Sequence, residues 1–319
     1  MVQALRYESC DKIMSETSLV NFLINRVKKD LNLATLFYWY ISVECPDKNK
    51  KETRTVVNEF YEIIHSKFLG VLEEEQPEIF NALLMQNKIR ERFKEINEKI
   101  RKMDLSRKKE ELRKIAGTSE FQKNIFQEQS FCLNTNYHIT SMEPEECTVF
   151  KSAMAPLRLC FHAYNVEEKE KGDIRYKVIF KSGDDLRQDQ LIIQMITLMD
   201  SLLKGVNVDC QLTPYKVLAC SKSDGFLEFV PDSNTLQEIL LKEGTLTNFF
   251  KKIADEQRIK DENLKKNNLS EIILNNFVDS CAGYCVITYF LGIGDRHKEN
   301  LMITNRGLFL FFLFIKFIC

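Results

Sequence analysis

The chain has 319 residues, a length that favours two domains, and 44% of its residues are hydrophobic, which is enough for real cores. Its formal net charge of −1 excludes a global field that would draw it to nucleic acid or a membrane surface. No secretory signal opens the chain and its ten cysteines form no CxxC pair, which predicts free thiols in a reducing compartment. No apolar run reaches the ~18 residues of a membrane-spanning helix, so we expect a soluble or peripheral protein.

Residues 1–117 carry helical signals and almost no glycine or proline. Two dense apolar runs, residues 19–24 and 33–41, suit the inner helices of a stacked helical array. Cys45-Pro46-Asp47 is expected to end the second helix, because proline cannot continue one. This part of the chain is therefore predicted to be a scaffold.

An apolar stripe with alternating steps of four and three residues runs from Ile89 to Met103. Between Lys88 and Lys114, twelve basic residues stand against six acidic ones. A basic amphipathic helix of this kind can lie on an anionic membrane or bind a partner. We favour the other interpretation, in which a long solvated helix docks its stripe on its neighbours.

The next stretch, residues 118–148, loses its periodicity and is predicted to be an interdomain linker of low order. Short β-like runs and one helix then predict a five-stranded antiparallel lobe. Four of these strands are assigned to particular runs, at residues 157–161, 175–181, 215–219 and 226–230. The helix follows a turn at residues 182–185, buries Leu186, Ile193, Ile196 and Leu203, and ends at Gly205.

Lys181 ends one of the predicted strands, and Asp189 lies in the first turns of the following helix. A kinase presents a positive charge to nucleotide phosphates in this way, on a strand-borne ammonium restrained by a helix-borne carboxylate. Considered as an isolated pair, the two residues are more often plain surface charges.

The part after Val230 is predicted to be helical, with a surface insertion at residues 251–268 and an N-cap signal at Asn268. An apolar helix over residues 272–291 would form the centre of a second lobe. The glycines at 292 and 294 break this helix and deliver Asp295, His297 and Asn300 into a loop, followed by a strand at 301–304 and a hairpin turn at 305–307. An Asp, a His and an Asn on one loop can orient a nucleophile and hold a metal.

Two long stretches resemble one enzyme family. Residues 178–191 (VIFKSGDDLRQDQL) resemble the ATP-site signature of phosphatidylinositol 3-kinases, and residues 280–297 (SCAGYCVITYFLGIGDRH) resemble their catalytic segment. The glycine before Asp-Arg-His, where 4-kinases have lysine, favours the 3-kinases. Residues 212–218 (LTPYKVL), with Gln190, resemble class III, the vacuolar-sorting lipid kinases. The resemblance covers nearly the whole chain and is weakest over residues 48–147 and 251–268.

This resemblance implies a multidomain α plus α/β fold, with a helical-repeat (PIK-type) segment before a truncated two-lobed catalytic domain of the PI3/PI4-kinase type. The implied boundaries are 1–117 for the C-terminal part of the helical domain, 118–148 for a linker and 149–319 for the catalytic domain. The catalytic domain would consist of an N-lobe at residues 149–230, an incomplete C-lobe at residues 231–307 and a divergent tail at residues 308–319.

On the nucleotide side, the resemblance implies that Lys181 contacts the ATP phosphates and that Asp189 holds Lys181. Ser152 would lie in a loop, without glycine, that covers the phosphates. The hinge residues Glu228, Phe229 and Val230 would hold adenine through their backbone groups. The aromatic ring of Tyr215 would line the adenine pocket.

On the catalytic side, the resemblance implies that Asp295 and His297 orient and deprotonate the inositol 3-hydroxyl and that Asn300 ligates Mg²⁺ or Mn²⁺. The substrate would be phosphatidylinositol in a membrane, which the protein meets peripherally on endosomal or autophagic membranes from the cytoplasm. Regulatory subunits of the class III complex would be its partners; no role with nucleic acid is expected.

The chain departs from the family after the hairpin. Counting from Gly307, the metal-binding Asp-Phe-Gly should fall at residues 313–315, which read Leu-Phe-Ile, and no activation loop follows. We therefore expect a fragment truncated at both ends, with a tail of unrelated sequence or a truncated gene model. Loss of a charge-stabilising group of this kind raises the activation free energy by roughly 3–4 kcal/mol, which slows the reaction a few hundredfold.

Two other functions stay open. A non-catalytic truncated homologue would act as a binding module through its helical segment. A protein kinase of the related large-kinase superfamily is a further candidate, against which the 212–218 segment and the short chain argue.

Overall fold

The structure is a computed structural model that describes residues 5, 18–46, 55–126, 129–168, 172–260, 269–294 and 296–312. The chain divides into two compact units. Unit 1 consists of residues 1–187 and 216–228, and unit 2 of residues 188–215 and 229–319. The chain therefore passes between the units after Arg187, after Tyr215 and after Glu228.

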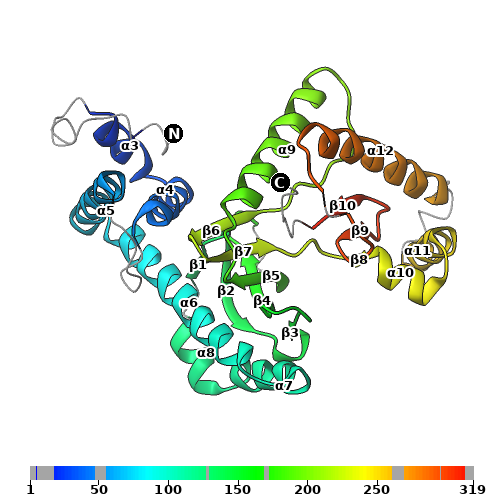
Figure 1. The fold of residues 1–319 in the computed structure, drawn as a ribbon, viewed down its shortest axis with the longest axis horizontal. Helices are drawn as coiled ribbons and strands as arrows, with labels where there is room; N and C mark the ends of the chain where they lie inside the picture. The colour runs from blue at the N-terminus through cyan, green and yellow to red at the C-terminus, as the bar shows by residue number, and fades with distance from the viewer. Residues whose placement is uncertain are drawn as a thin grey trace. The chain divides into compact units, whose positions relative to one another are not determined.

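The first part of unit 1 is helical, as its apolar runs predict (Figure 1). Side chains of Ser18, Asp30 and Thr55 accept backbone N–H bonds at the starts of three helices, which satisfies donors that the helices leave open. The second helix ends at Glu44, directly before Cys45-Pro46, which confirms the predicted end. The helices are α3 (Leu19–Val27), α4 (Leu31–Glu44), α5 (Val56–Glu75), α6 (Pro77–Arg101), α7 (Leu105–Ala116) and α8 (Ser119–Ile125).

The apolar stripe of α6 is docked inside unit 1, because Ile89, Phe93, Ile96 and Ile100 are all buried. The Phe93 ring is surrounded by four other phenylalanine rings, with centroid distances of 6.0 to 6.3 Å. These rings belong to α8 and to three strands of the sheet, so one core joins helices and sheet. This packing confirms the interpretation of the stripe as a docking face.

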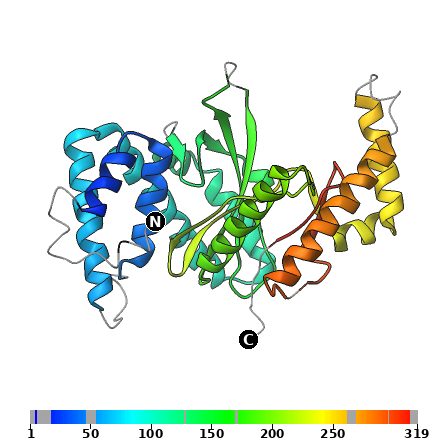
Figure 2. The same cartoon turned by 90° about the horizontal axis from the view of Figure 1, so that it is seen from above.

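The sheet of unit 1 has seven antiparallel strands in the order β1-β2-β4-β5-β7-β6, with β3 paired to β4. The long hairpin of β4 and β5 is prominent in Figure 2. The strands are β1 (Gln129–Phe131), β2 (Asn134–Met142), β3 (Thr148–Val149), β4 (Leu157–Asn165), β5 (Ile174–Ser182), β6 (Val217–Ser221) and β7 (Asp224–Glu228).

The prediction of a low-order linker over residues 118–148 is wrong, since this segment contains α8, β1 and β2. With these strands the sheet has seven strands, where five were expected. The β2 pattern hides the strand, because only Thr135, Ile139 and Met142 of its nine residues are buried. Gln122 of α8 ties the segment together: its side chain donates to the Met142 carbonyl at 3.2 Å and accepts the Met142 N–H at 3.0 Å.

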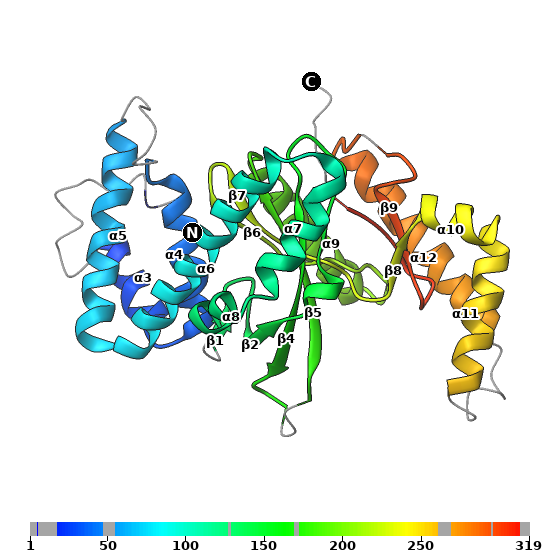
Figure 3. The same ribbon diagram turned by 90° about the horizontal axis from the view of Figure 1, so that it is seen from below.

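Unit 2 contains four helices and a three-stranded antiparallel sheet, β10-β9-β8, among the residues that the structure describes. Figure 3 shows α11 beside α12, and these two helices share one apolar cluster with Ile303 of β9. The elements are α9 (Arg187–Gly205), α10 (Leu236–Glu243), α11 (Leu246–Lys260), α12 (Leu269–Phe290), β8 (Ser233–Thr235), β9 (Leu301–Thr304) and β10 (Phe309–Phe311).

Several predictions for unit 2 are confirmed and two need correction. Gly205 is the last residue of α9, but Leu203 is only half-buried. The predicted surface insertion at residues 251–268 is wrong for its first part, because residues 251–260 continue α11 and bury Ile253. Residues 261–268, which include the predicted N-cap Asn268, lie outside the described residues. The predicted hairpin after β9 turns at Gly307, whose φ of 82° favours glycine, and a Cβ there would clash with the Ile273 carbonyl. No described helix is long and apolar enough to cross a membrane.

Tyr38 of α4 predicts an alkaline loss of stability. Burial raises the pKa of its phenol to about 12, an effect that the positive charge of Arg90 partly opposes. A raised folded-state pKa gives stability that is complete below the ordinary value of about 10 and is lost as the pH rises toward 12, by about 2–3 kcal/mol. Urea unfolding of the wild type and Tyr38→Phe at pH 9 and pH 11.5 measures this loss of unfolding free energy. An equally large loss between the two pH values in Tyr38→Phe would show that the phenol is not the cause.

Candidate nucleotide and catalytic site

Lys181 lies one residue before the end of β5 in unit 1, and only 3% of its side chain is exposed. Its ammonium is 3.8 Å from the Asp184 carboxylate, in the turn that follows the strand. Burying an ammonium costs free energy unless acceptors or anions compensate, so a strand end of this kind is suited to an anionic ligand.

Ser152 is exposed in the loop of residues 150–156, which joins β3 to β4. The loop is closed by its own backbone, through bonds from Phe150 N–H to the Pro156 carbonyl at 3.0 Å and from Ala155 N–H to the Ser152 carbonyl at 3.1 Å. Ala155 adopts a left-handed φ of 47°, which is unusual for a residue with a Cβ. The loop therefore has a fixed shape without glycine.

Asp189 lies in the first turn of α9, and 4% of it is exposed. It belongs to unit 2, whereas Lys181 belongs to unit 1. The predicted pairing of the two thus stays a prediction.

The predicted hinge, Glu228 to Val230, lies where the chain leaves unit 1 and enters unit 2. Glu228 N–H donates to the Lys216 carbonyl at 2.8 Å, and the Glu228 carboxylate accepts the Lys216 N–H at 3.0 Å. The Val230 carbonyl accepts the Ser233 hydroxyl at 2.6 Å. These bonds fix the crossing segment at both ends.

Tyr215 of the predicted adenine pocket is buried in unit 2 and stacks on Phe312, with ring centroids 4.8 Å apart and an interplanar angle of 13°. The Phe229 ring of the hinge lies 6.0 Å from the same Phe312 ring. Phe312 thus connects the two aromatic residues that the resemblance assigns to adenine.

Asn300 organises the predicted catalytic loop from a buried position, with 1% of it exposed. Its side-chain oxygen accepts the His297 N–H at 3.1 Å, and its own N–H donates to the His297 carbonyl at 3.0 Å. Its carbonyl accepts the Phe312 N–H at 2.8 Å. Asp295, the predicted orienting carboxylate, lies outside the described residues.

His297 is exposed, and its Nδ1 lies 3.3 Å from the Glu299 N–H that donates to it. A neutral imidazole that accepts at Nδ1 carries its proton on Nε2. In this arrangement Nε2 can donate a hydrogen bond to a hydroxyl oxygen. To remove a proton from a hydroxyl, the imidazole must use the nitrogen that carries no proton. Either Nδ1 must release the Glu299 N–H and face the substrate, or the proton must move from Nε2 to Nδ1.

The sequence analysis did not anticipate the contacts of Phe311 and Phe312 with predicted site residues and Arg296, because it assigned residues 308–319 to a divergent tail. Residues 309–311 form β10 on the predicted hairpin, and the guanidinium of Arg296 lies 3.7 Å from the Phe311 ring centroid. The signal was available, since a strand is expected at this place after the turn. Residues 313–319 lie outside the described ones.

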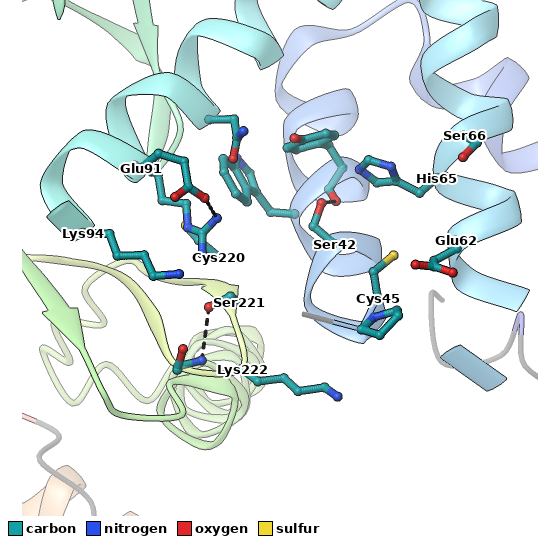
Figure 4. A pocket seen from close by; sticks show the side chains of 16 residues that line it. Ser42, Cys45, Glu62, His65, Ser66, Glu91, Lys94, Cys220, Ser221 and Lys222 are labelled. Carbon is teal, nitrogen blue, oxygen red and sulfur yellow. Dashed lines mark hydrogen bonds and ion pairs between the residues drawn. The ribbon is translucent and has the colours of Figure 1, made fainter. Parts of the chain in front are cut away.

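A cavity of about 460 Å³ in unit 1 is lined by α4, α5, α6 and the turn between β6 and β7 (Figure 4). Arg90 stands in its wall and makes two bonds of 2.6 Å to the Asp224 carboxylate, together with a bond to Glu91. None of the sequence-predicted site residues is among the residues that line this cavity.

Each unit contains one residue whose side-chain atoms are of the type that the implied ligands need. The Lys181 ammonium suits phosphate oxygens, and the Asn300 amide oxygen is a ligand type that Mg²⁺ accepts. The side chain of Leu313 has no oxygen that could serve as a ligand at a second metal position. No group of three or more His, Cys, Asp and Glu side chains forms a metal site within the described ranges.

The chain matches two protein families. Residues 175–312 match the phosphatidylinositol 3- and 4-kinases, and residues 1–73 match the accessory (PIK) domain of the phosphoinositide 3-kinase family. The first match contains β5, the hinge, the catalytic loop and β10.

Similar curated proteins cover nearly the whole chain. It is 36% identical over 316 residues to the phosphatidylinositol 3-kinase VPS34 of Arabidopsis thaliana, an alignment that spans 96% of this chain and 36% of that protein. It is 36% identical to the phosphatidylinositol 3-kinase pik3 of Schizosaccharomyces pombe, with 97% of this chain and 37% of that protein covered. The VPS34 of Saccharomyces cerevisiae is 35% identical over 291 residues, which are 91% of this chain and 30% of that protein.

The chain thus spans about a third of the length of these relatives. It has a PIK helical segment followed by catalytic-domain sequence, and its helices and curled antiparallel sheet are those of a two-lobed lipid kinase. By these matches, and by the two motifs that run through β5 and α12, the chain belongs to the phosphatidylinositol 3-kinase family, in its class III branch.

Proposed function

We propose that this chain carries the ATP site of a phosphatidylinositol 3-kinase, with Lys181 on the nucleotide phosphates, Asp189 restraining it and Ser152 in the covering loop. The single observation that carries the proposal is the buried Lys181 ammonium at the end of β5, inside the segment that matches the kinase family. The hinge at Glu228–Val230 and the Tyr215 ring would hold the adenine. Asn300 would hold Mg²⁺ or Mn²⁺, which would neutralise charge on the phosphates.

The reaction proposed for the whole protein is transfer of the γ-phosphoryl group of ATP to the 3-hydroxyl of phosphatidylinositol, which gives ADP and phosphatidylinositol 3-phosphate. The similarity to two proteins named as phosphatidylinositol 3-kinases supports this reaction. Asp295 and His297 would orient the hydroxyl and accept its proton. The proposed setting is the cytoplasmic surface of endosomal and autophagic membranes, in complex with regulatory subunits.

The chain as written is proposed to turn over slowly. Leu313 stands where the family has a metal-binding aspartate, and the loss of such charge stabilisation corresponds to a rate reduction of a few hundredfold or more. A second candidate function follows from the same observation: a homologue without catalysis that binds nucleotide and the kinase's partners.

Phosphate transfer from radiolabelled ATP to phosphatidylinositol vesicles, with binding of the nucleotide measured in parallel, tests both statements. The expected result for the 319-residue chain is binding of Mg-ATP with little transfer. Vigorous lipid phosphorylation that is abolished by Asp295→Asn would refute the slow-turnover proposal. Transfer to peptide substrates in place of lipid would refute the assignment of substrate.

A further inference from the structure

Helix α6 reaches two parts of the proposed phosphate site from one face. Arg90 and Asn97 are seven residues apart on this helix, which places them two turns apart on the same side. Both are buried, with 9% and 0% of the residue exposed. Buried polar groups require partners, and the partners of Arg90 and Asn97 lie next to Lys181 and in the Ser152 loop.

Asn97 holds the loop that contains Ser152. Its side-chain NH₂ donates to the carbonyl of Ala155 at 2.7 Å, across 58 residues of sequence. Ala155 is fully buried and left-handed, with a φ of 47°, so its carbonyl points in a direction that an ordinary loop conformation would not give. The amide of Asn97 therefore stabilises the one strained residue of a loop that has no glycine to relieve it.

Arg90 holds the strand end that carries Lys181. Its guanidinium binds both oxygens of Asp224, which pairs in register with Ser182, the neighbour of Lys181. The Gly183 N–H donates to the Ser223 carbonyl at 2.6 Å, so the turn after Lys181 is tied to the same hairpin. Through Arg90 and Asn97, α6 is bonded both to the hairpin beside Lys181 and to the Ser152 loop, which are also joined by the pairing of β4 with β5.

We propose that Asn97 is a positioning residue for nucleotide binding, which fixes the phosphate-covering loop at its working distance from Lys181. The inference rests on the proposed ATP site. Asn97 is fully buried and its side chain donates to the Ala155 carbonyl, so it acts on the site through the loop and not on the substrate. Such a residue raises affinity by reducing the conformations that the loop must lose when nucleotide binds.

Gln86 provides a matched control on the same helix. Its side-chain amide is also buried, with 1% exposed, and hydrogen-bonds to Trp39, Thr35 and Ser130, none of which belongs to the proposed site. Gln86→Ala and Asn97→Ala each remove a buried amide from α6. A merely structural effect of losing such an amide would therefore be similar in the two variants.

The test compares Asn97→Ala, Asn97→Asp and Gln86→Ala in the full chain, by binding of trinitrophenyl-ATP and by hydrogen exchange of the amides of residues 150–156. We expect Asn97→Ala, which lacks the donor, and Asn97→Asp at a pH where its carboxylate is ionised and cannot donate, to bind the nucleotide about tenfold more weakly and to exchange faster in the loop. Gln86→Ala should leave nucleotide affinity and loop exchange unchanged.

Unchanged loop exchange in both Asn97 variants would overturn the inference, as would an equal loss of affinity in Gln86→Ala. Ala155→Gly provides a second route, because glycine adopts a φ of 47° without strain, so the loop depends less on the Asn97 bond to hold this conformation. In the Ala155→Gly background, Asn97→Ala should therefore weaken nucleotide binding less than it does alone. A wild-type chain that binds no nucleotide, with the loop still loosened by Asn97→Ala, would refute the ATP site and leave the role of Asn97 in the loop standing.

Discussion

Replacing Asp224 by alanine is expected to lower the free energy of unfolding of unit 1 by about 3–5 kcal/mol. The carboxylate is fully buried, binds the Arg90 guanidinium through both oxygens and accepts the Ser221 hydroxyl at 2.7 Å. Removing it leaves a guanidinium with only 10% of its side chain exposed, still bonded to Glu91 but without its buried partner. The cost is mainly that of a buried charge left uncompensated.

Urea denaturation followed by circular dichroism measures this loss. The control is Lys99→Ala, which breaks an exposed pair with Glu111 of the same 2.6 Å length and should cost about 1 kcal/mol or less. The double variant Arg90→Met/Asp224→Leu removes both charges and should regain most of the stability. A loss under 1 kcal/mol in Asp224→Ala would contradict the account of this pair.

Phe93→Ala is expected to cost about 3–5 kcal/mol, through lost burial and the cavity that the side chain leaves. The ring is fully buried and lies within 6.3 Å, centroid to centroid, of Phe121, Phe161, Phe180 and Phe226. Because these rings come from a helix and three strands, the cavity would separate α6 from the sheet and could not close by a single side-chain movement.

The matched control is Phe22→Ala on α3, where the same ring is 66% exposed and its removal should cost about 0.5 kcal/mol or less. Both variants are compared by chemical denaturation and by near-ultraviolet circular dichroism. Equal stabilities for Phe93→Ala and Phe22→Ala would mean that the aromatic cluster does not hold α6 to the sheet.

The sequence predicts those parts of the fold whose periodicity is strong and local. The apolar density of α4, the proline after it and the stripe of α6 each carry a period of 3.6 residues or a helix-ending signal, and each is found where expected. The β9–β10 hairpin is found as well, because its Asn-Arg-Gly turn has a specific conformational requirement at Gly307.

The missed features depend on contacts between distant segments. The strand β2 is polar on most of its length and is stabilised by partners on both sides, so its own pattern does not reveal it. The pairs Arg90–Asp224 and Asn97–Ala155 are 134 and 58 residues apart, and a basic helix gives no sign of which polar residues face inward. Phe312 was missed because residues 308–319 were assigned to a divergent tail once the metal-binding triplet was absent, although the hairpin turn predicts a strand there.

The central claim, that Lys181 binds the phosphates of a nucleotide, is tested most directly by Mg-ATP titration of the wild type, Lys181→Met and Lys177→Met. Lys177 lies on the same strand with 36% of its side chain exposed and pairs with Glu146, so it controls for loss of a β5 lysine. We predict that Lys181→Met weakens binding at least tenfold, as expected for a charge-assisted contact, while Lys177→Met binds as the wild type does. Equal affinities in all three proteins, or equal losses in both variants, would contradict the claim.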